Sequence, residues 1–311
     1  MVKFGLYLPV YGGWIRSSVN EKEETPTYSY VRQVAIEAEK IGIDSLWIPD
    51  HLLNPIKGES SFSLEAWTVA AAIAEVTKKV TIAHTTLCEA FRYPAVLAKQ
   101  IVALNEISNG RFWLSIGAGW FKREYEAYGL PFYEHDERIT RTKEAIQIIK
   151  KLWKEDGVTF KGKYYQIENG VLEPKPNPIP RIWYGGVTEA SRNLAAEEVD
   201  GWLMNESTVE EVQKNINDMN ERLKKKGRSK LQYGVPADTL IRETDKIAIE
   251  HMTQMHGDKK RLERVLNTGL IGSPETVVQK IKNLENSGVD HILLKLSPTL
   301  KELKQIKRII D

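Results

Sequence analysis

The feature that most constrains this chain is a regular alternation of short, apolar, β-branched runs with longer segments of helical periodicity, which continues through its 311 residues. Such alternation is typical of strand–helix units around a parallel sheet whose strands are buried on both faces. Eight units favour an α/β fold of the (β/α)8 TIM barrel type, with a doubly wound open sheet as the alternative. The predicted strands are residues 3–10, 45–50, 80–87, 111–119, 181–186, 201–205, 231–241 and 291–296.

Two segments are too long to be simple connections between a strand and a helix. Residues 155–180 are predicted to contain a hairpin with a Lys-Gly turn, followed by a proline-rich approach to the next strand. Residues 242–270 are polar and poorly periodic, so they are predicted to form either a lid or a surface decoration. We interpret residues 1–311 as one barrel domain that carries these two insertions.

Charge and cysteine content restrict the class of ligand. Lys and Arg number 44 against 42 Asp and Glu, and the net charge of +2 gives no strong field for nucleic acid or for an anionic membrane. Cys88 is the only cysteine, which excludes an internal disulfide and a multi-cysteine metal site. No apolar run has the length of a membrane span, and no cleavage signature follows the start. We therefore expect a cytoplasmic protein that acts on a small molecule.

The residues that follow the strands are the first candidates for a site, because TIM barrels place their active sites at the carboxyl ends of the strands. After the fifth strand, Gly185 and Gly186 lead directly into a helix, which would present backbone N–H groups and a helix dipole to an anion. This turn is predicted either to bind a phosphate or to be a tight turn capped by Thr188. The same rule also selects Tyr11, Gly12, Trp120, Asn205, Glu206, Asp238 and Arg242.

The second and fourth strands end in residues of different chemistry. His51 could exchange protons near neutral pH, with Asp50 or a backbone carbonyl setting its tautomer. The alternative is that Asp50 caps the next segment and His51 has no catalytic role. Small residues around Ala118 would let the backbone approach a flat ligand, although they could also serve packing alone.

The run EHDER at residues 134–138 first suggests a metal site. Consecutive helical residues are about 100° apart and cannot converge on one ion, and no His-Glu-x-x-His motif occurs, so no metal is predicted. Asp136 and Glu137 suit a helix N-terminus. His135 stands four residues before an apolar stripe and is predicted to overlook the barrel opening with Arg138, one turn further on. A core histidine beside a surface arginine is the alternative.

With these residues assembled, the chain resembles the bacterial-luciferase-like flavin-dependent oxidoreductases over nearly its whole length. That superfamily folds as a (β/α)8 barrel and uses either reduced FMN with oxygen or the deazaflavin coenzyme F-420 for hydride transfer. The segments that carry the resemblance are SLWIPDHLL, FRYPAVLAKQIVALNEISNGRFWLSIGAGWFKREYEAYGLPF, EHDERITRTKEAI, VTFKGKYYQIENGVLEPKP, YGGVTEASRNLAAEEVDGW, LIRET and GLIGSPETVVQKIKNLENSGVDHILL.

The second half most resembles the alkanesulfonate and dimethylsulfone monooxygenases, which receive reduced FMN from a separate reductase. By that resemblance Glu124, Arg138, Thr188 and Ser191 would surround the flavin and its phosphate. His135 matches an active-site histidine of related alkane monooxygenases. The chain departs from the alkanesulfonate enzymes at residues 236–238, where Pro-Ala-Asp replaces their Arg-x-His.

The first half is closer to the deazaflavin-dependent branch. In that branch an Asp-His pair like Asp50 and His51 contacts the cofactor and moves protons. Its third strand also carries a strained non-proline peptide near the position of Thr85 and Thr86. The two halves of the chain therefore point to different reduced cofactors.

The sequence as a whole predicts an FMN-dependent monooxygenase that acts on a small, organosulfur substrate with electrons from a separate flavin reductase. A deazaflavin-dependent reductase or dehydrogenase is the alternative, and a flavin-binding protein without turnover is the third possibility. The family resemblance also implies a homodimer or a higher homo-oligomer. The predicted catalytic residues are His135 and His51. The predicted cofactor-binding residues are Asp50, Thr85, Thr86, Cys88, Ala118, Glu124, Arg138, Gly186, Val187, Thr188 and Ser191.

Overall fold

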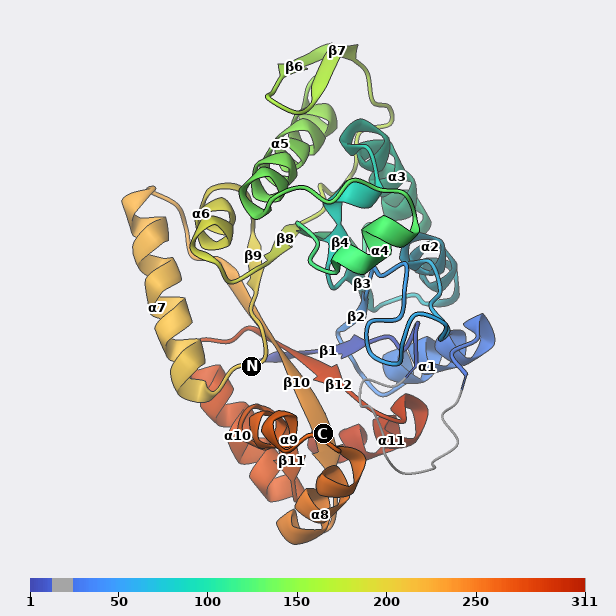
Figure 1. The fold of residues 1–311 in the computed structure, drawn as a ribbon, viewed down its shortest axis with the longest axis vertical. Helices are drawn as coiled ribbons and strands as arrows, with labels where there is room; N and C mark the ends of the chain where they lie inside the picture. The colour runs from blue at the N-terminus through green and yellow to red at the C-terminus, as the bar shows by residue number, and fades with distance from the viewer. Residues whose placement is uncertain (13–24, 311) are drawn as a thin grey trace.

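The computed structural model describes residues 1–12 and 25–310, and its parallel strands close into a barrel (Figure 1). Around the barrel the strands follow the order β1, β2, β3, β5, β8, β9, β10 and β12, and β12 pairs with β1 to complete the circle. The predicted (β/α)8 barrel is confirmed, and the open-sheet alternative is wrong. The barrel strands are β1 (Lys3–Tyr7), β2 (Ser45–Ile48), β3 (Thr81–His84), β5 (Phe112–Gly117), β8 (Ile182–Gly185), β9 (Gly201–Leu203), β10 (Gln232–Ile241) and β12 (His291–Lys295).

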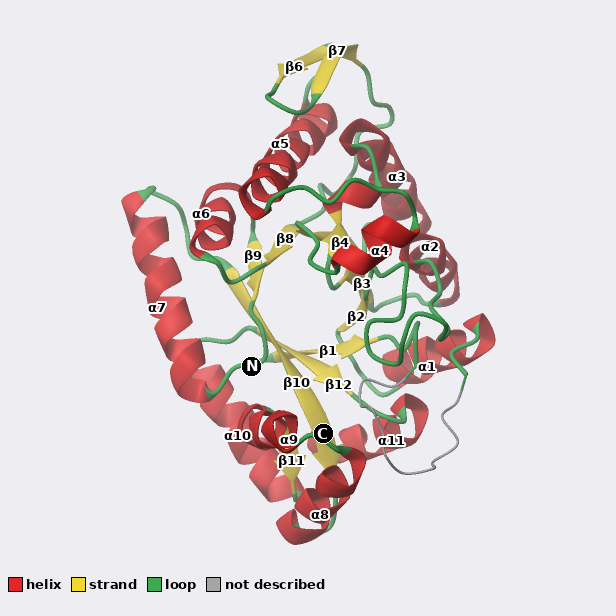
Figure 2. Cartoon of the chain, in the orientation of Figure 1, coloured by secondary structure: helices red, strands yellow, loops and turns green. Residues whose placement is uncertain are grey.

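Helices surround the barrel and return the chain from one strand to the next (Figure 2). This arrangement leaves the carboxyl ends of the strands, and the loops that follow them, together at one face of the barrel. The helices are α1 (Tyr28–Lys40), α2 (Ala66–Val76), α3 (Pro94–Ile107), α4 (Lys122–Ala127), α5 (His135–Lys154), α6 (Glu189–Glu198), α7 (Val209–Lys225), α8 (Asp245–Met255), α9 (Lys259–Thr268), α10 (Pro274–Asn286) and α11 (Thr299–Ile310).

Some predicted strand ends differ from the structure. The strand predicted at residues 3–10 ends at Tyr7. The strand predicted at residues 80–87 divides into β3 and the short β4 (Leu87–Cys88), which pairs with β5 and leads into the 3-10 turn η1 (Glu89–Phe91). Apolar runs alone do not mark these ends, because the chain stays buried where it leaves the sheet.

Residues 242–270, which have no clear periodicity in the sequence, contain the helices α8 and α9. They are followed by β11 (Leu270–Gly272), which pairs with the last residues of β10. These helices have a small apolar core of their own with β10 and β11, formed by Leu240, Ala248, Met252, Met255, Val265 and Ile271. The sequence pattern does not reveal α8 and α9, because these short, charged helices each bury only a few side chains and so have no clear apolar stripe.

Aromatic side chains fill much of the barrel interior. The ring of Trp183 lies 5.5 Å from that of Trp47 and 5.9 Å from that of Trp113, measured between centroids. Gly201 leaves room for this packing, since a Cβ there would lie 2.3 Å from Cδ2 of Trp183. Burying a large apolar side chain contributes about 1.5–3 kcal/mol, so this stack helps to hold the barrel rigid beneath its carboxyl face.

The helix α7 begins with a reciprocal cap. The Thr208 hydroxyl accepts from the Glu211 N–H, and the Glu211 carboxylate accepts from the Thr208 N–H. We expect Thr208→Ala to lower the free energy of unfolding by about 1 kcal/mol, because one of these bonds is lost. Urea denaturation measures the change. Thr208→Ser keeps the hydroxyl and should lose much less, and equal losses in the two variants would contradict the capping role.

Residues 158–170 form an antiparallel hairpin of β6 (Val158–Lys161) and β7 (Gln166–Gly170). The hairpin lies against one end of α5 (Figure 1). The Glu144 carboxylate of α5 accepts the backbone N–H groups of Lys163, Tyr164 and Tyr165 at 2.7–3.0 Å. A second contact links the hairpin to η1, where the Tyr165 hydroxyl donates to Glu89 at 2.5 Å.

Burial raises the pKa of the Glu89 carboxyl from 4.5 to about 7. Because the folded protein then holds a proton that the unfolded chain has released, stability should fall as the pH rises from about 4.5 to about 7. We expect Glu89→Gln to remove this pH-dependent part of the stability, and the variant should be at least as stable as the wild type at pH 8. Denaturation at several pH values tests this, and an unchanged pH dependence in the variant would refute it.

Candidate active site

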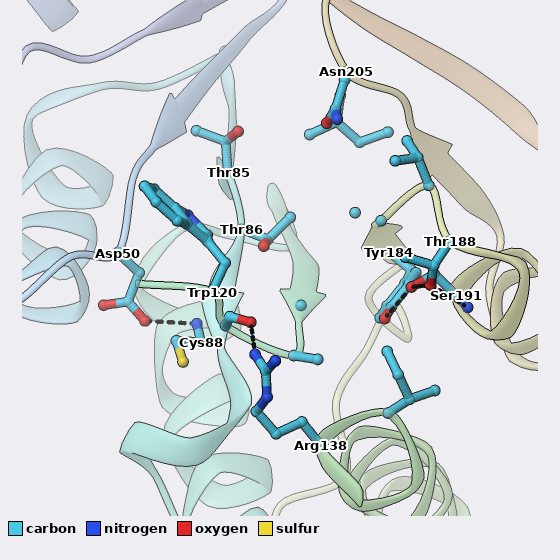
Figure 3. A pocket seen from close by; sticks show the side chains of 18 of the residues that line it. Asp50, Thr85, Thr86, Cys88, Trp120, Arg138, Tyr184, Thr188, Ser191 and Asn205 are labelled. Carbon is cyan, nitrogen blue, oxygen red and sulfur yellow. Dashed lines mark hydrogen bonds between the residues drawn. The ribbon is translucent and has the colours of Figure 1, made fainter. Parts of the chain in front are cut away.

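A cavity of about 470 Å³ opens at the carboxyl ends of the strands, a size typical of ligand and cofactor sites. In Figure 3, Thr85, Thr86 and Trp120 stand on one side of it and Tyr184, Thr188 and Asn205 on the other. Every residue predicted to be catalytic or to bind the cofactor lines this cavity. These residues are Asp50, His51, Thr85, Thr86, Cys88, Ala118, Glu124, His135, Arg138, Gly186, Val187, Thr188 and Ser191. Five further candidates of the strand-end rule do not line it, namely Tyr11, Gly12, Glu206, Asp238 and Arg242.

His51 and Glu124 form a pair beside the cavity. Nδ1 of His51 lies 3.1 Å from Oε2 of Glu124, and the same oxygen accepts the Leu52 N–H at 2.9 Å. The histidine side chain is 14% exposed and the carboxylate only 2%. Glu124, rather than Asp50 or a backbone carbonyl, is therefore the partner that orients His51. A buried carboxylate on one imidazole nitrogen leaves the other nitrogen to exchange a proton.

Asp50 has a different set of partners. Its carboxylate accepts the Cys88 N–H at 2.8 Å and two N–H groups of Arg92, at 2.7 and 3.2 Å. A bidentate pair of this kind fixes the loop after β2 against the turn after β4. Cys88 is buried, which raises the pKa of its thiol, and Sγ lies 2.9 Å from the Tyr125 hydroxyl. Asp50 and Cys88 both line the cavity, and these contacts hold them in its wall.

Thr85 and Thr86 form the part of the wall that follows β3, and the peptide bond between them is cis. The Thr85 hydroxyl donates to the Tyr7 hydroxyl at 2.7 Å. Burial raises the pKa of Tyr7 to about 12, so its phenol remains protonated at neutral pH. The wall therefore offers neutral hydroxyl groups to a bound ligand.

The turn from β8 into α6 has the geometry of an anion cradle. Thr188 caps α6, its hydroxyl accepting the Ser191 N–H and donating to the Ser191 hydroxyl at 2.9 Å. Gly186 has φ +156°, and a Cβ there would lie 2.8 Å from Oγ of Ser191. The Thr188 cap, one of the two alternatives that the sequence left open, is confirmed, and phosphate binding by the same turn stays a prediction. A helix N-terminus with converging hydroxyl groups suits a phosphate.

His135 and Arg138 line the cavity from the start of α5, beside this turn. Nε2 of His135 lies 3.4 Å from the Thr188 hydroxyl, so the first turns of α5 and α6 meet there. The His135 side chain is 44% exposed, and the core-histidine alternative is therefore wrong. Arg138 donates to the carbonyl oxygens of Gly119 and Tyr133. Its charge adds to the positive potential of the two helix ends.

Asp136 and Glu137 lie in the first turn of α5, as expected for acidic residues near a helix N-terminus. Among the described residues there is no group of three or more His, Cys, Asp or Glu side chains that could hold a metal ion. None of the helices in the described part of the chain is long and apolar enough to cross a membrane.

Several lining residues were not predicted as site residues. Trp120 and Asn205 follow strands, and the strand-end rule had selected both without giving them a role. Others have no recognisable sequence signal, because apolar and aromatic residues look the same in a sequence whether they pack in the core or line a cavity. These are Tyr7, Ile139, Tyr184, Leu203, Met204 and Pro236.

The barrel and its cavity can now be compared with known proteins. The family model of the luciferase-like monooxygenases matches residues 3–291. The chain belongs to this family. Membership confirms the resemblance found in the sequence and the prediction that the protein is an enzyme.

Curated relatives represent two branches of the luciferase-like family. An FMNH2-dependent dimethylsulfone monooxygenase from Pseudomonas putida is 26% identical, over 94% of this chain and 89% of the relative. An F420-dependent glucose-6-phosphate dehydrogenase from Amycolatopsis mediterranei is 28% identical, over 84% of this chain and 86% of the relative. Among solved structures, a long-chain alkane monooxygenase shares the fold with a TM-score of 0.85 at 17% identity, over 99% of this chain and 90% of that one.

Proposed function

We propose that this luciferase-like protein is a two-component monooxygenase: it takes reduced FMN from a separate reductase and transfers one oxygen atom of O2 to a small organosulfur substrate. The observation that carries the proposal is the joining, in one cavity, of an anion cradle on α6 with a buried imidazole–carboxylate pair. The first suits a cofactor phosphate, and the second suits proton transfer. The chain is 26% identical to a dimethylsulfone monooxygenase and covers 89% of it, which supports monooxygenation as the reaction.

The residues of the cavity fit FMN. Thr188, Ser191 and the turn at Gly186 would hold the phosphate, with the charge of Arg138 nearby. Thr85 and Thr86, with the small residues after β5, would face the flat ring system. When bound, the reduced flavin supplies the electrons and activates oxygen.

The protein's own part in the reaction is to move protons and to exclude water. His51, oriented by Glu124, is the group placed to donate or accept a proton inside the cavity. The rings of Tyr11 and Trp120 lie within 6.1 Å of the imidazole and surround it with apolar surface. A dry and oriented proton donor of this type raises rates by roughly 10²- to 10⁴-fold.

One observation favours a second candidate, a deazaflavin-dependent reductase or dehydrogenase. Asp50 and His51 follow β2 and line the cavity together with Thr85 and Thr86. The 28% identity to an F420-dependent dehydrogenase is consistent with that candidate. The α6 cradle would accept a phosphate of either cofactor, so the two must be separated by measured affinity.

We also propose that the protein is a homo-oligomer, and that α3 contributes to the contact. The apolar side chains of Tyr93, Val96 and Ile107 are 50%, 56% and 43% exposed on this helix and at its start. Val171, which follows β7 of the hairpin, is 70% exposed. Exposed apolar side chains of this kind are typical of a surface that associates.

Isotope transfer tests the proposed activity. The protein, a flavin reductase, its reduced nicotinamide coenzyme, FMN and dimethyl sulfone are incubated under oxygen-18 gas, so that one oxygen atom of O2 enters the product and the other leaves as water. The proposal predicts product that carries one labelled oxygen atom per turnover, with no turnover when the reductase is omitted. Hydride transfer from the reduced deazaflavin without oxygen uptake would contradict it and favour the second candidate.

A further inference from the structure

A second cavity, of about 360 Å³, opens at the amino ends of the barrel strands, at the opposite end of the barrel from the candidate active site. The two cavities share no lining residue among those that the structure describes. Part of the wall of the second cavity comes from the end of α1 and from the loops before β2 and β3. The rest comes from residues at the starts of five barrel strands, which are Lys3, Ser45, Thr81, Trp113 and His291.

His291 lines this second cavity with an unpaired imidazole. The residue is 1% exposed, and neither ring nitrogen has a hydrogen-bond partner among the described residues. The rings of Trp113 and Trp183 pack nearly at right angles to the imidazole, with centroids 5.6 and 5.2 Å away. Burying a polar group without a partner is costly, and a ligand that accepts the ring N–H would remove that cost.

The charges that act on this imidazole come from cations. Burial, together with the charges of Lys3 and Arg181, lowers the pKa of His291 to about 4, so the ring is neutral at pH 7 and has one N–H donor. Lys3 and Lys79 both line the cavity, and neither forms an ion pair with a described residue. An anion in the cavity would therefore meet ammonium groups that no ion pair already holds.

Two carboxylates also line the second cavity, but backbone N–H groups hold both of them. Glu39 accepts the N–H groups of residues 78–80 at 2.7–3.1 Å. Asp44 accepts the Phe4 N–H at 2.8 Å. These acids fix the loops before β2 and β3 at the rim of the cavity, and their hydrogen bonds with the backbone offset part of their charge.

Two hydroxyl groups complete the set of donors. Ser45 accepts the indole N–H of Trp47 at 2.8 Å, so its own O–H remains to donate to a ligand. Thr81 pairs with Ser45 across β2 and β3 and lines the cavity beside it. A ligand that has only acceptor atoms and a negative charge suits this combination of ammonium, imidazole and hydroxyl donors.

We propose that the cavity at the amino ends of the strands binds a small tetrahedral oxyanion, to which Lys3, Lys79 and His291 donate hydrogen bonds. The site uses no residue of the candidate active site and does not depend on the proposed function. Lys3 and His291 are partners in the pairing of β1 with β12, where the barrel closes. A bound anion would link these two strands, and it stabilises the folded barrel by mass action.

Calorimetric titration of inorganic sulfate into the FMN-saturated protein tests the inference, because FMN then occupies the turn at the start of α6. We expect saturable binding at one site in the wild type. Lys3→Met and His291→Phe should each raise the sulfate dissociation constant at least about tenfold, since each removes a donor. Lys246→Met is the matched control, because this lysine is 83% exposed on α8, and it should leave the affinity unchanged. No saturable binding, or equal dissociation constants in all four proteins, would overturn the inference.

The pH dependence of sulfate binding reports on the imidazole itself. A bound anion favours the imidazolium form, so binding takes up a proton and the affinity should rise as the pH falls. Sulfate keeps its charge from about pH 5.5 to about pH 8, and among the charged residue types around the site only histidine ordinarily titrates there. The other charged residues around it are Lys3 on β1, Glu39 on α1, Asp44 before β2, Lys79 before β3, Arg181 before β8 and Asp290 before β12.

We expect the wild type to bind sulfate at least about threefold more tightly at pH 5.5 than at pH 8, and His291→Phe to lose this difference. A flat profile in the wild type would contradict the contact with His291. Inorganic phosphate and glycerol phosphate are then compared at pH 7. Tighter binding of glycerol phosphate would assign the site to a phosphorylated metabolite, and tighter binding of phosphate would assign it to the free anion.

The variant Ser191→Asp separates this site from the proposed phosphate site on α6. It should bind sulfate as the wild type does, because Ser191 lines the first cavity and not the second. Loss of sulfate binding in Ser191→Asp, with full binding in Lys3→Met, would place the anion at α6 and overturn the inference. A protein that fails to bind FMN contradicts the proposed function, while the sulfate titrations of these two variants still decide the present inference.

Discussion

Replacement of His51 by Ala is expected to lower kcat by roughly 10²- to 10⁴-fold, because the cavity loses the imidazole that the Glu124 carboxylate orients at 3.1 Å. Binding of reduced FMN should change little, since the proposed phosphate cradle lies on α6. Glu124→Gln keeps a hydrogen-bond acceptor for the Leu52 N–H but removes the negative charge. It should therefore reduce kcat less than His51→Ala does. Single-turnover kinetics with preloaded reduced flavin measures both effects.

The matched control for this prediction is Glu126→Gln. Glu126 lies on the same helix, α4, and its exposed carboxylate is 3.5 Å from Lys122 at the surface. This variant should retain full activity and stability. If His51→Ala loses thermal stability in proportion to its activity, or keeps wild-type kcat, then His51 is a structural residue and the acid–base role is wrong.

Substitution Ser191→Asp is expected to raise the dissociation constant for FMN by at least about 100-fold, which corresponds to about 2.7 kcal/mol. The side chain of Ser191 is buried in the turn, where it receives a hydrogen bond from Thr188. A carboxylate at this position would repel a phosphate and remove a hydroxyl donor. Fluorescence titration with oxidised FMN and with riboflavin measures the effect. Because riboflavin has no phosphate, its affinity should fall far less.

Two further variants accompany Ser191→Asp. Thr188→Val removes the capping hydroxyl without adding charge, so it should weaken FMN binding by a smaller factor. Ser229→Asp places the same new charge on an exposed serine in the loop after α7 and should have no effect. Equal losses of FMN and riboflavin affinity in Ser191→Asp would indicate damage to the fold and would contradict a phosphate site on α6.

The barrel could be predicted from the sequence because its strands are apolar on both faces and its helices have one apolar stripe. Both patterns are local, and each predicted strand overlaps a barrel strand. The strand-end rule then placed many of the predicted site residues on one cavity, since parallel strands present their carboxyl ends together. The helix pattern and the family resemblance supplied the others, which are Glu124, His135, Arg138 and Ser191. This repeated order predicts the barrel, but it does not give the ends of the strands or the helices α8 and α9.

The pairing of side chains could not be predicted in the same way. Asp50 and His51 are neighbours in sequence, yet the structure pairs Asp50 with Arg92 and His51 with Glu124. Each partner comes from a later loop whose path depends on tertiary packing. The charged cluster around Asp238 is a similar case, because Arg261 reaches it from α9 and Lys295 from β12. The spacing of residues in the sequence does not predict contacts between side chains that lie far apart along the chain.

The most direct test of the central claim is a comparison of the affinities of the wild-type protein for reduced FMN and for the reduced deazaflavin coenzyme. Both are titrated without oxygen and followed by their own absorbance. The turn at the start of α6 and the relation to the dimethylsulfone monooxygenase predict that reduced FMN binds more tightly, and that Ser191→Asp weakens this binding by at least about 100-fold. Binding of the deazaflavin alone would contradict the claim that the cavity is the reduced-FMN site of a monooxygenase.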